Sequence, residues 1–255
     1  MIDTLSLTHI LFLDVETVSG TYMLNELTDE MQYLWKVKAA QILRKPIEDI
    51  DEEQFANTYQ NRAAIYAEFG KIVCISVGLV VETGKNGKLG VRLKSFQGYD
   101  EAKLLTDFSE LMNQYFHDTS THYMCGHNLR EFDVPYICRR MVVHSLKLPN
   151  MLQLHGKKPW ETKYLLDTMD MWKFGDFKHY SSLKLLTGIF GIPSPKDDID
   201  GSEVGRVFWE DKDVDRIAAY CEKDVLAVIQ IMMKFKRMDT FEAEDITSLL
   251  TEIEE

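Results

Sequence analysis

Residues 8–15 (THILFLDV) form an eight-residue run that is apolar on both faces of an extended chain and ends in charge. Side chains alternate between the two faces of a strand, so such a run is typical of a central strand that is covered on both sides. The chain is therefore expected to fold as an α/β protein around this strand. Asp14 and Glu16 lie at its end, and their spacing of two residues places them on the same face.

Two acids on one face of a strand repel each other. Beside the apolar residues 10–13, the charges of Asp14 and Glu16 are unfavourable unless cations neutralise them. A pair of acids that simply begins an exposed loop has the same sequence pattern. The pair alone therefore does not define a site.

The rest of the chain alternates between strand-like and helical patterns. Residues 20–66 have helical spacing interrupted at Pro46 and are predicted to form a helical insertion after the first strand. No internal repeat or low-complexity linker divides the chain, which favours one α/β domain. Further strands are predicted at 71–81, 89–96 and 123–126, and a last strand within 164–172. Further helices are predicted at 101–116, 134–144, 183–190, 203–210 and 214–236.

The last long helix carries an acid on its apolar face. Asp224 lies in the middle of this face, and Tyr220 lies one turn before it. A buried Asp usually has a hydrogen-bond partner or a metal, although an Asp224 paired with a nearby Lys or Arg, and a Tyr220 that fills the core, are the simpler alternatives. The apolar residues of this face are Ile217, Cys221, Val228, Ile231 and Phe235.

A third acid, Asp133, stands at the junction between a predicted strand and helix, just before Pro135. An acid in the first turn of a helix is favoured by the helix dipole, so Asp133 needs no further role. Asn128 in the same loop is either a turn residue or a group that fixes the loop or contacts a substrate sugar.

Taken in order, the patterns Asp-x-Glu, Asn-x-x-x-x-Asp-x-Pro and Tyr-x-x-x-Asp resemble the three motifs of the DEDD (DnaQ-like) 3′–5′ exonucleases of the ribonuclease H-like superfamily, in the form with Tyr in the third motif. The chain also looks like the predicted 3′–5′ exonucleases related to the exonuclease domain of family B DNA polymerases. That resemblance covers roughly residues 10–238. It includes FLDVET (12–17), GKIVCISV (70–77), GHN (126–128), LDTMD (166–170) and DIDGSEV (198–204).

The resemblance implies a ribonuclease H-like three-layer fold, with a mixed five-stranded sheet flanked by helices. It implies an exonuclease domain over residues 1–238 and an acidic tail over 239–255. It also implies two Mg²⁺ or Mn²⁺ ions, with Asp14 bridging them, Glu16 and Asp224 on the ion that holds the attacking water, and Asp133 on the other. Tyr220 would orient that water. The implied activity is hydrolysis from the 3′ end of single-stranded DNA, releasing nucleoside 5′-monophosphates.

Five residues near the motifs are expected to contact the terminal nucleotides, with Arg130 meeting a phosphate and Phe132 stacking on a base. Asp167 and Asp170 are expected to hold loops or to order metal-bound waters. The five expected substrate contacts are Thr17, Asn128, Leu129, Arg130 and Phe132.

Three other functions are compatible with parts of the pattern. An exoribonuclease on short RNA is the first alternative, and a catalytically silent nucleic-acid-binding module of the same fold is the second. The presence of all four acids and the tyrosine disfavours the silent module. A phosphatase of the haloacid dehalogenase type is disfavoured because Glu16 departs from its motif.

The formal net charge of −12 argues against the broad basic surface of a protein that wraps duplex nucleic acid. It does not argue against a protein that grips nucleic acid through bound cations. Seven acidic residues and no Lys or Arg lie in 239–255, which leaves −5 on residues 1–238. We expect this tail to be a solvated or weakly helical appendage and expect the protein to bind at a strand end.

No segment is both apolar and long enough to span a bilayer, and no secretory signal is visible, so a cytoplasmic protein without membrane association is expected. The sequence leaves the protein partners unknown. The cysteines contain no CxxC pair, which argues against a zinc knuckle and a disulfide framework. They are Cys74, Cys125, Cys138 and Cys221.

Overall fold

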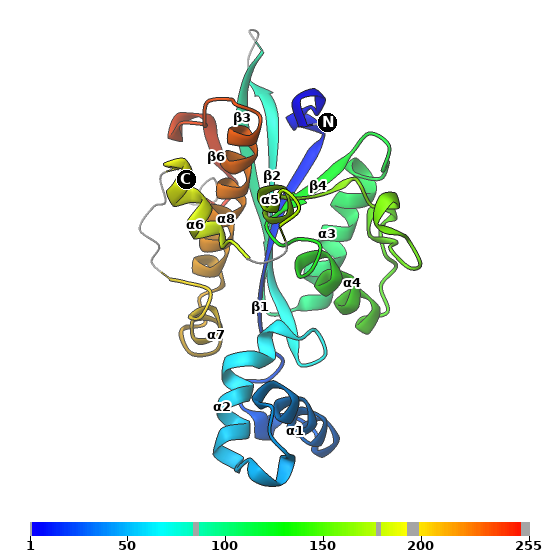
Figure 1. Cartoon of the computed structure of the whole chain (residues 1–255), viewed down its shortest axis with the longest axis vertical. Helices are drawn as coiled ribbons and strands as arrows, with labels where there is room; N and C mark the ends of the chain where they lie inside the picture. Colours follow the sequence, from blue (N-terminus) through cyan, green and yellow to red (C-terminus); the bar gives the residue numbers. More distant parts are fainter. Residues whose placement is uncertain (1, 84–86, 177–179, 193–198, 251–255) are drawn as a thin grey trace.

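The computed structural model describes residues 2–83, 87–176, 180–192 and 199–250. Within these residues, helices cover both faces of a mixed six-stranded sheet with the order β5-β4-β1-β2-β3-β6 (Figure 1). The three-layer α/β architecture is thus confirmed, but the expected number of five strands is wrong. The strands are β1 (Ile10–Ser19), β2 (Gly70–Thr83), β3 (Lys88–Gln97), β4 (Tyr123–Gly126), β5 (Leu165–Asp167) and β6 (Ile246–Ser248).

Strand β1 pairs antiparallel with β2 and parallel with β4, while β3 pairs antiparallel with β2 and parallel with β6. In the described part of the chain, no helix is long and apolar enough to cross a membrane. The α-helices are α1 (Asp29–Leu43), α2 (Glu52–Arg62), α3 (Glu101–Tyr115), α4 (Asp133–Val143), α5 (Thr168–Lys173), α6 (Leu183–Phe190), α7 (Val204–Arg206) and α8 (Val214–Phe235). Short 3₁₀ turns are η1 (Ile2–Thr4), η2 (Leu7–His9), η3 (Leu24–Glu26), η4 (Ile47–Asp49), η5 (Ala63–Ile65), η6 (Asn150–Leu152), η7 (Pro159–Glu161) and η9 (Ala243–Asp245).

The central strand is buried on both sides, as its sequence predicts. Leu11 and Leu13 face α3 and α4, whereas Ile10 and Phe12 face α8, and all four side chains are completely buried. Each such burial stabilises the fold by about 1.5–3 kcal/mol. Figure 1 shows α8 on one side of the sheet and α3 and α4 on the other. Asp14 and Glu16 therefore lie on a strand whose position is fixed by packing on both of its faces.

The sixth strand lies in the acidic segment that was expected to be solvated. Ile246 of β6 pairs with Val91 of β3, and Asp245 forms an ion pair of 2.5 Å with Lys88. The expectation of a solvated appendage is therefore wrong for residues 245–249, which join the open edge of the sheet, whereas residues 242–244 are exposed. Residues 251–255, and Asp198 of the DIDGSEV motif, lie outside the described residues.

The last strand lies within 164–172, as predicted, but is only three residues long because α5 begins directly after it. The carboxylate of Asp167 accepts hydrogen bonds from the backbone N–H groups of Met169 and Asp170, which caps the new helix. The predicted helix 203–210 is also interrupted, since α7 passes into a π-helical turn, η8 (Val207–Asp211).

The helical insertion has a hydrophobic core of its own at one end of β1 and β2 (Figure 1). Trp35 is fully buried, with ring centroids 5.2 Å from Tyr59 and 5.0 Å from Phe69. The insertion is tied to the sheet at the carbonyl of Ala64, which accepts a hydrogen bond from Thr17 on β1. The predicted insertion after the first strand is confirmed.

Glu101 is a buried acid that joins α3, β2 and α4. Its carboxylate accepts hydrogen bonds from the backbone N–H of Ile72 (2.7 Å), from the Arg140 guanidinium (2.9 and 2.6 Å) and from His144 (2.7 Å). Burial raises the pKa of Glu101, but these hydrogen bonds and the charge of Arg140 outweigh it, so the pKa is lower than its ordinary value. The ionised form is therefore the one that the fold stabilises.

Replacing Glu101 by Gln is expected to lower the free energy of unfolding by about 3 kcal/mol at pH 7, because Arg140 loses its buried partner. The pKa is lower in the folded protein, so this contribution is present above the unfolded-state pKa of about 4.3 and is lost as the pH falls through the folded-state pKa. Urea unfolding at pH 7, 5 and 3.5 measures the difference. Asp107→Asn, which removes an exposed pair with Lys103, is the control and should cost under about 1 kcal/mol. A difference for Glu101→Gln that does not change with pH would contradict this account.

Candidate active site

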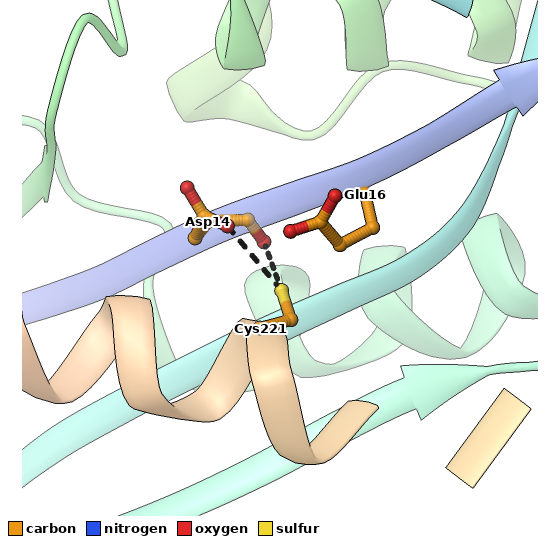
Figure 2. A group of neighbouring side chains, drawn as sticks. All are labelled: Asp14, Glu16 and Cys221. Carbon is orange, nitrogen blue, oxygen red and sulfur yellow. Dashed lines mark hydrogen bonds between the residues drawn. The ribbon is translucent and has the colours of Figure 1, made fainter. Parts of the chain in front are cut away.

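Asp14 and Glu16 leave β1 on the face covered by α8. Each is partly buried, and their carboxylate oxygens lie within 4.8 Å of each other and of the Cys221 sulfur from α8 (Figure 2). The strand register places Asp14 opposite Ser76 and Glu16 opposite Cys74. The two acids predicted from the sequence to share a face do share it, above the central part of the sheet.

Asp133 reaches the same strand from its edge. Strand β4 ends at Gly126, so its last pairing with β1 is between Cys125 and Phe12. Within the described residues, β1 has no strand partner on that edge further along. Asp133 begins α4, is only 2% exposed, and accepts hydrogen bonds from its own N–H and from the N–H of Val15. The Asp133 carboxylate therefore bonds to the backbone of β1 at Val15, between Asp14 and Glu16, where a neighbouring strand would otherwise pair.

The loop that delivers Asp133 is held by another acid. The Asp167 carboxylate accepts hydrogen bonds from the N–H groups of Asn128 (3.0 Å) and Arg130 (3.1 Å), besides its bonds within α5. These bonds fasten loop 126–132 to the end of β5. Asp167 therefore has the loop-holding position that was expected for it, whereas Asp170 is exposed and pairs with Lys173.

Helix α8 brings Tyr220 and Asp224 to the acids. The Tyr220 hydroxyl donates a hydrogen bond to the Asp224 carboxylate, and both side chains are partly buried. Asp224 is near enough to Asp14 and Glu16 for its charge to raise the pKa of each. The structure thus brings together all four acids and the tyrosine from three separate segments of the chain.

The electrostatics of this group are unfavourable without positive charge. Burial and the neighbouring carboxylates raise the pKa of Asp14 and of Glu16 well above their ordinary values. Burial likewise raises the pKa of Asp133 to about 7. Among the described residues, no Lys, Arg or His forms an ion pair with these three acids. Four carboxylates in this setting are a donor set that fits hard divalent cations such as Mg²⁺ or Mn²⁺.

Residues 65–255, about three quarters of the sequence, match the family model of a predicted 3′–5′ exonuclease related to the exonuclease domain of PolB. The chain belongs to this family of predicted 3′–5′ exonucleases. The match includes Asp133, Tyr220 and Asp224 but begins after β1. Asp14 and Glu16 therefore join the site on the evidence of the structure.

A solved structure of the family B DNA polymerase from the hyperthermophilic archaeon Pyrobaculum calidifontis is similar to this exonuclease-family chain with a TM-score of 0.51 and 13% identity. The similarity covers 89% of this chain but only 24% of the polymerase chain. It shows that the two share a fold, which is the ribonuclease H-like fold expected from the motifs. No curated protein matches the chain.

Three of the five predicted substrate contacts are engaged elsewhere in this member of the family. Leu129 is completely buried in the core, so we withdraw it as a contact. The Arg130 guanidinium donates hydrogen bonds to the Leu165 carbonyl (3.3 Å) and the Thr162 hydroxyl (3.0 Å). Phe132 is partly buried and packs on Tyr136.

The other two candidates differ in what they leave free. The Thr17 hydroxyl donates to the Ala64 carbonyl at 2.9 Å, which gives it a role in holding the insertion. Asn128 has a left-handed backbone (φ 65°), and its buried Oδ1 atom has no hydrogen-bond partner among the described residues. Asn128 is therefore the candidate that retains an unused acceptor.

The sequence patterns placed Cys221 on the apolar face of the last helix and gave it no further role. In the structure its thiol contacts Asp14, as the hydrogen bonds in Figure 2 show. The signal that was available is its position on the same helical face as Asp224, three residues before it and directly after Tyr220.

Replacing Asp167 by Asn is expected to loosen the loop that holds Asp133, because an amide offers one acceptor oxygen where the carboxylate offers two. We expect about a 10- to 100-fold loss of Mn²⁺ affinity, the usual effect of removing a group that orients metal ligands. Calorimetric titration with Mn²⁺ measures it. Asp170→Asn, three residues further on and exposed, is the matched control and should leave the affinity unchanged. Equal affinities for the two variants would contradict the assignment.

Proposed function

We propose that the protein is a divalent-metal-dependent 3′–5′ exonuclease that removes nucleoside 5′-monophosphates from the 3′ end of single-stranded DNA. The observation that carries this proposal is the convergence of Asp14, Glu16, Asp133 and Asp224 in a partly buried group. Asp14, Glu16 and Asp133 have no cationic side chain paired to them in the described residues. The family to which the chain belongs supports the reaction class.

The four acids would hold two Mg²⁺ or Mn²⁺ ions. Asp14 would be shared by both ions, Glu16 and Asp224 would hold the ion next to the attacking water, and Asp133 would hold the other. When bound, two such ions activate a water and stabilise the departing 3′-oxygen of a phosphodiester. All four donors are oxygen atoms, which favours Mg²⁺ or Mn²⁺ over zinc.

Tyr220 would orient the attacking water. Burial and the neighbouring Asp224 and Glu16 raise the pKa of Tyr220, so its hydroxyl keeps its proton at neutral pH and does not act as the base. The hydroxyl already donates to Asp224, which fixes the direction of its lone pairs. The unused Oδ1 atom of Asn128 would accept a hydrogen bond from a hydroxyl of the terminal sugar.

The charge of the chain supports a small contact at a strand end. The formal net charge of −12 leaves no excess of positive charge for gripping a duplex along its length. Bound cations would neutralise the negative charge of the site acids only at the position of the scissile phosphate. We therefore propose single-stranded or frayed 3′ ends as substrate, with DNA favoured over RNA.

Digestion of 5′-labelled single-stranded DNA, duplex DNA and RNA with Mg²⁺, Mn²⁺ or EDTA tests the proposal. A 3′–5′ exonuclease leaves the label on a ladder of shortening strands, and EDTA should abolish the ladder. Asp14→Asn and Asp224→Asn should lower the rate by on the order of 10³-fold, since each removes a ligand of the ions that stabilise the transition state. Asp170→Asn is the control with an equal change in charge.

Three outcomes would contradict parts of this proposal. Cleavage in EDTA, or equal rates for wild type and Asp14→Asn, would refute the metal-dependent mechanism. Release of the label as a mononucleotide would reverse the polarity. Faster digestion of short RNA than of single-stranded DNA would replace DNA by RNA as the substrate.

Replacing Tyr220 by Phe is expected to lower kcat by about 10- to 100-fold, because a water that is no longer held in line reacts from fewer orientations. Calorimetric titration should give a loss of Mn²⁺ affinity of at most about 10-fold, since Tyr220 is not a ligand but donates a hydrogen bond to the proposed ligand Asp224. Tyr99→Phe, a change to an exposed tyrosine, is the control. A Tyr220→Phe variant with the wild-type kcat would show that the side chain only fills space.

A further inference from the structure

The thiol of Cys221 is the hydrogen-bond donor to Asp14. Cys221 is completely buried on α8, and its sulfur lies 3.5 Å from Oδ2 and 3.4 Å from the carbonyl oxygen of Asp14 (Figure 2). Among the described residues, no second donor reaches the Asp14 carboxylate. Asp133, by comparison, is held by two backbone N–H groups. The Cys221 thiol is therefore what restrains the rotation of the Asp14 carboxylate, a torsion that otherwise has a broad energy minimum.

We propose that Cys221 is a positioning residue, whose thiol turns the Asp14 carboxylate into the orientation in which it receives the divalent cations. This inference rests on the proposed function for the role of Asp14. Oδ2 accepts the thiol proton, so the remaining lone pairs of the carboxylate are left for cations. The same helix face carries Asp224, so one rigid element sets the position of a ligand and of the donor that orients a second ligand.

The direction of the hydrogen bond follows from the available protons. A thiol has one proton, and both oxygen atoms of Asp14 that Cys221 contacts are acceptors. Cys74 also lies beside Cys221, and its own sulfur is 3.5 Å from the Ser76 hydroxyl. Cys74 is buried opposite Glu16 in the strand register. The proton in the contact with Asp14 is therefore the one on the Cys221 thiol.

Direct ligation of the cations by sulfur is the competing role. The Cys221 sulfur is within 4.8 Å of oxygen atoms of both acids, so distance alone permits it. A ligating sulfur would have to give up its proton, add a fourth negative charge next to Asp14, Glu16 and Asp224, and leave Asp14 without its donor. Hard cations also prefer the oxygen atoms already present. The geometry therefore favours the donor role.

Mn²⁺ affinity, measured by calorimetric titration without substrate, tests the positioning role. Cys221→Ala and Cys221→Val remove the donor, and Val also fills the space of the thiol. Each should weaken Mn²⁺ binding by about 10-fold, as expected for loss of a group that orients a ligand. Cys221→Ser keeps a donor and should restore the affinity to within about threefold of wild type. Cys138→Ala, which removes a thiol that donates to the Leu152 carbonyl on the other side of the sheet, is the matched control.

The S–H stretching band of Cys221 in the infrared reports the bond itself without any cation. The difference spectrum between wild type and Cys221→Ser identifies the band, and Asp14→Ala should move it to the frequency of a free thiol. An unmoved band, or a Mn²⁺ affinity of Cys221→Val equal to that of wild type, would overturn the inference. A sulfur-to-metal absorption band with Cd²⁺ that disappears in Cys221→Ser would overturn it in favour of direct ligation.

These readouts separate the inference from the proposed function. Mn²⁺ binding that depends on Cys221, in a protein that yields no ladder from labelled strands, would refute the exonuclease and support the positioning role. A ladder that depends on Asp14, together with unchanged Mn²⁺ affinity in the Cys221 variants, would support the exonuclease and refute the positioning role.

Discussion

Mutual repulsion among partly buried carboxylates is the constraint on which this structure depends. Strand β1 is covered on both sides, so Asp14 and Glu16 enter a region of low dielectric where their charges interact strongly. The raised pKa values of both acids express this cost. The fold can keep such a group only because the rest of the sheet and both helical layers hold β1 firmly in place. Asp14 and Glu16 are thereby held on a strand that is packed on both of its faces.

The neighbouring elements are arranged so that the third acid can approach. A longer β4 would pair with the edge of β1 and exclude Asp133, but β4 ends at Gly126 and leaves the Val15 N–H free for the Asp133 carboxylate. Asp167 then holds the loop that makes this connection. Because β4 ends early and Asp167 holds the loop that follows it, Asp133 can line one side of the site at the edge of β1.

The parts of this arrangement that depend on local pattern could be predicted from the sequence. A run that is apolar on both faces predicts a central strand, and an acid on the apolar face of the last helix predicts that Asp224 is buried with a partner. That Asp224 meets the acids of the strand is implied only by the resemblance to the exonuclease motifs. Contacts between distant segments leave no such pattern. Strand β6 is three residues long, and the burial of Leu129 depends on how its loop folds back. The role of Cys221 likewise appears only when α8 is placed against β1.

Three positions within one turn of α8 explain how the helix is oriented. Cys221 donates to Asp14 on β1, and Asp224 faces the same site. Between them, the buried Glu222 accepts hydrogen bonds from Ser95 on β3 (2.9 Å) and from Ser248 on β6 (2.5 Å). A rotation of α8 that displaced Asp224 would break both sets of bonds at once. The C-terminal strand, which its acidic sequence suggested was solvated, thus fixes the rotation of the helix from the side opposite the acids, and the geometry of the site depends on it.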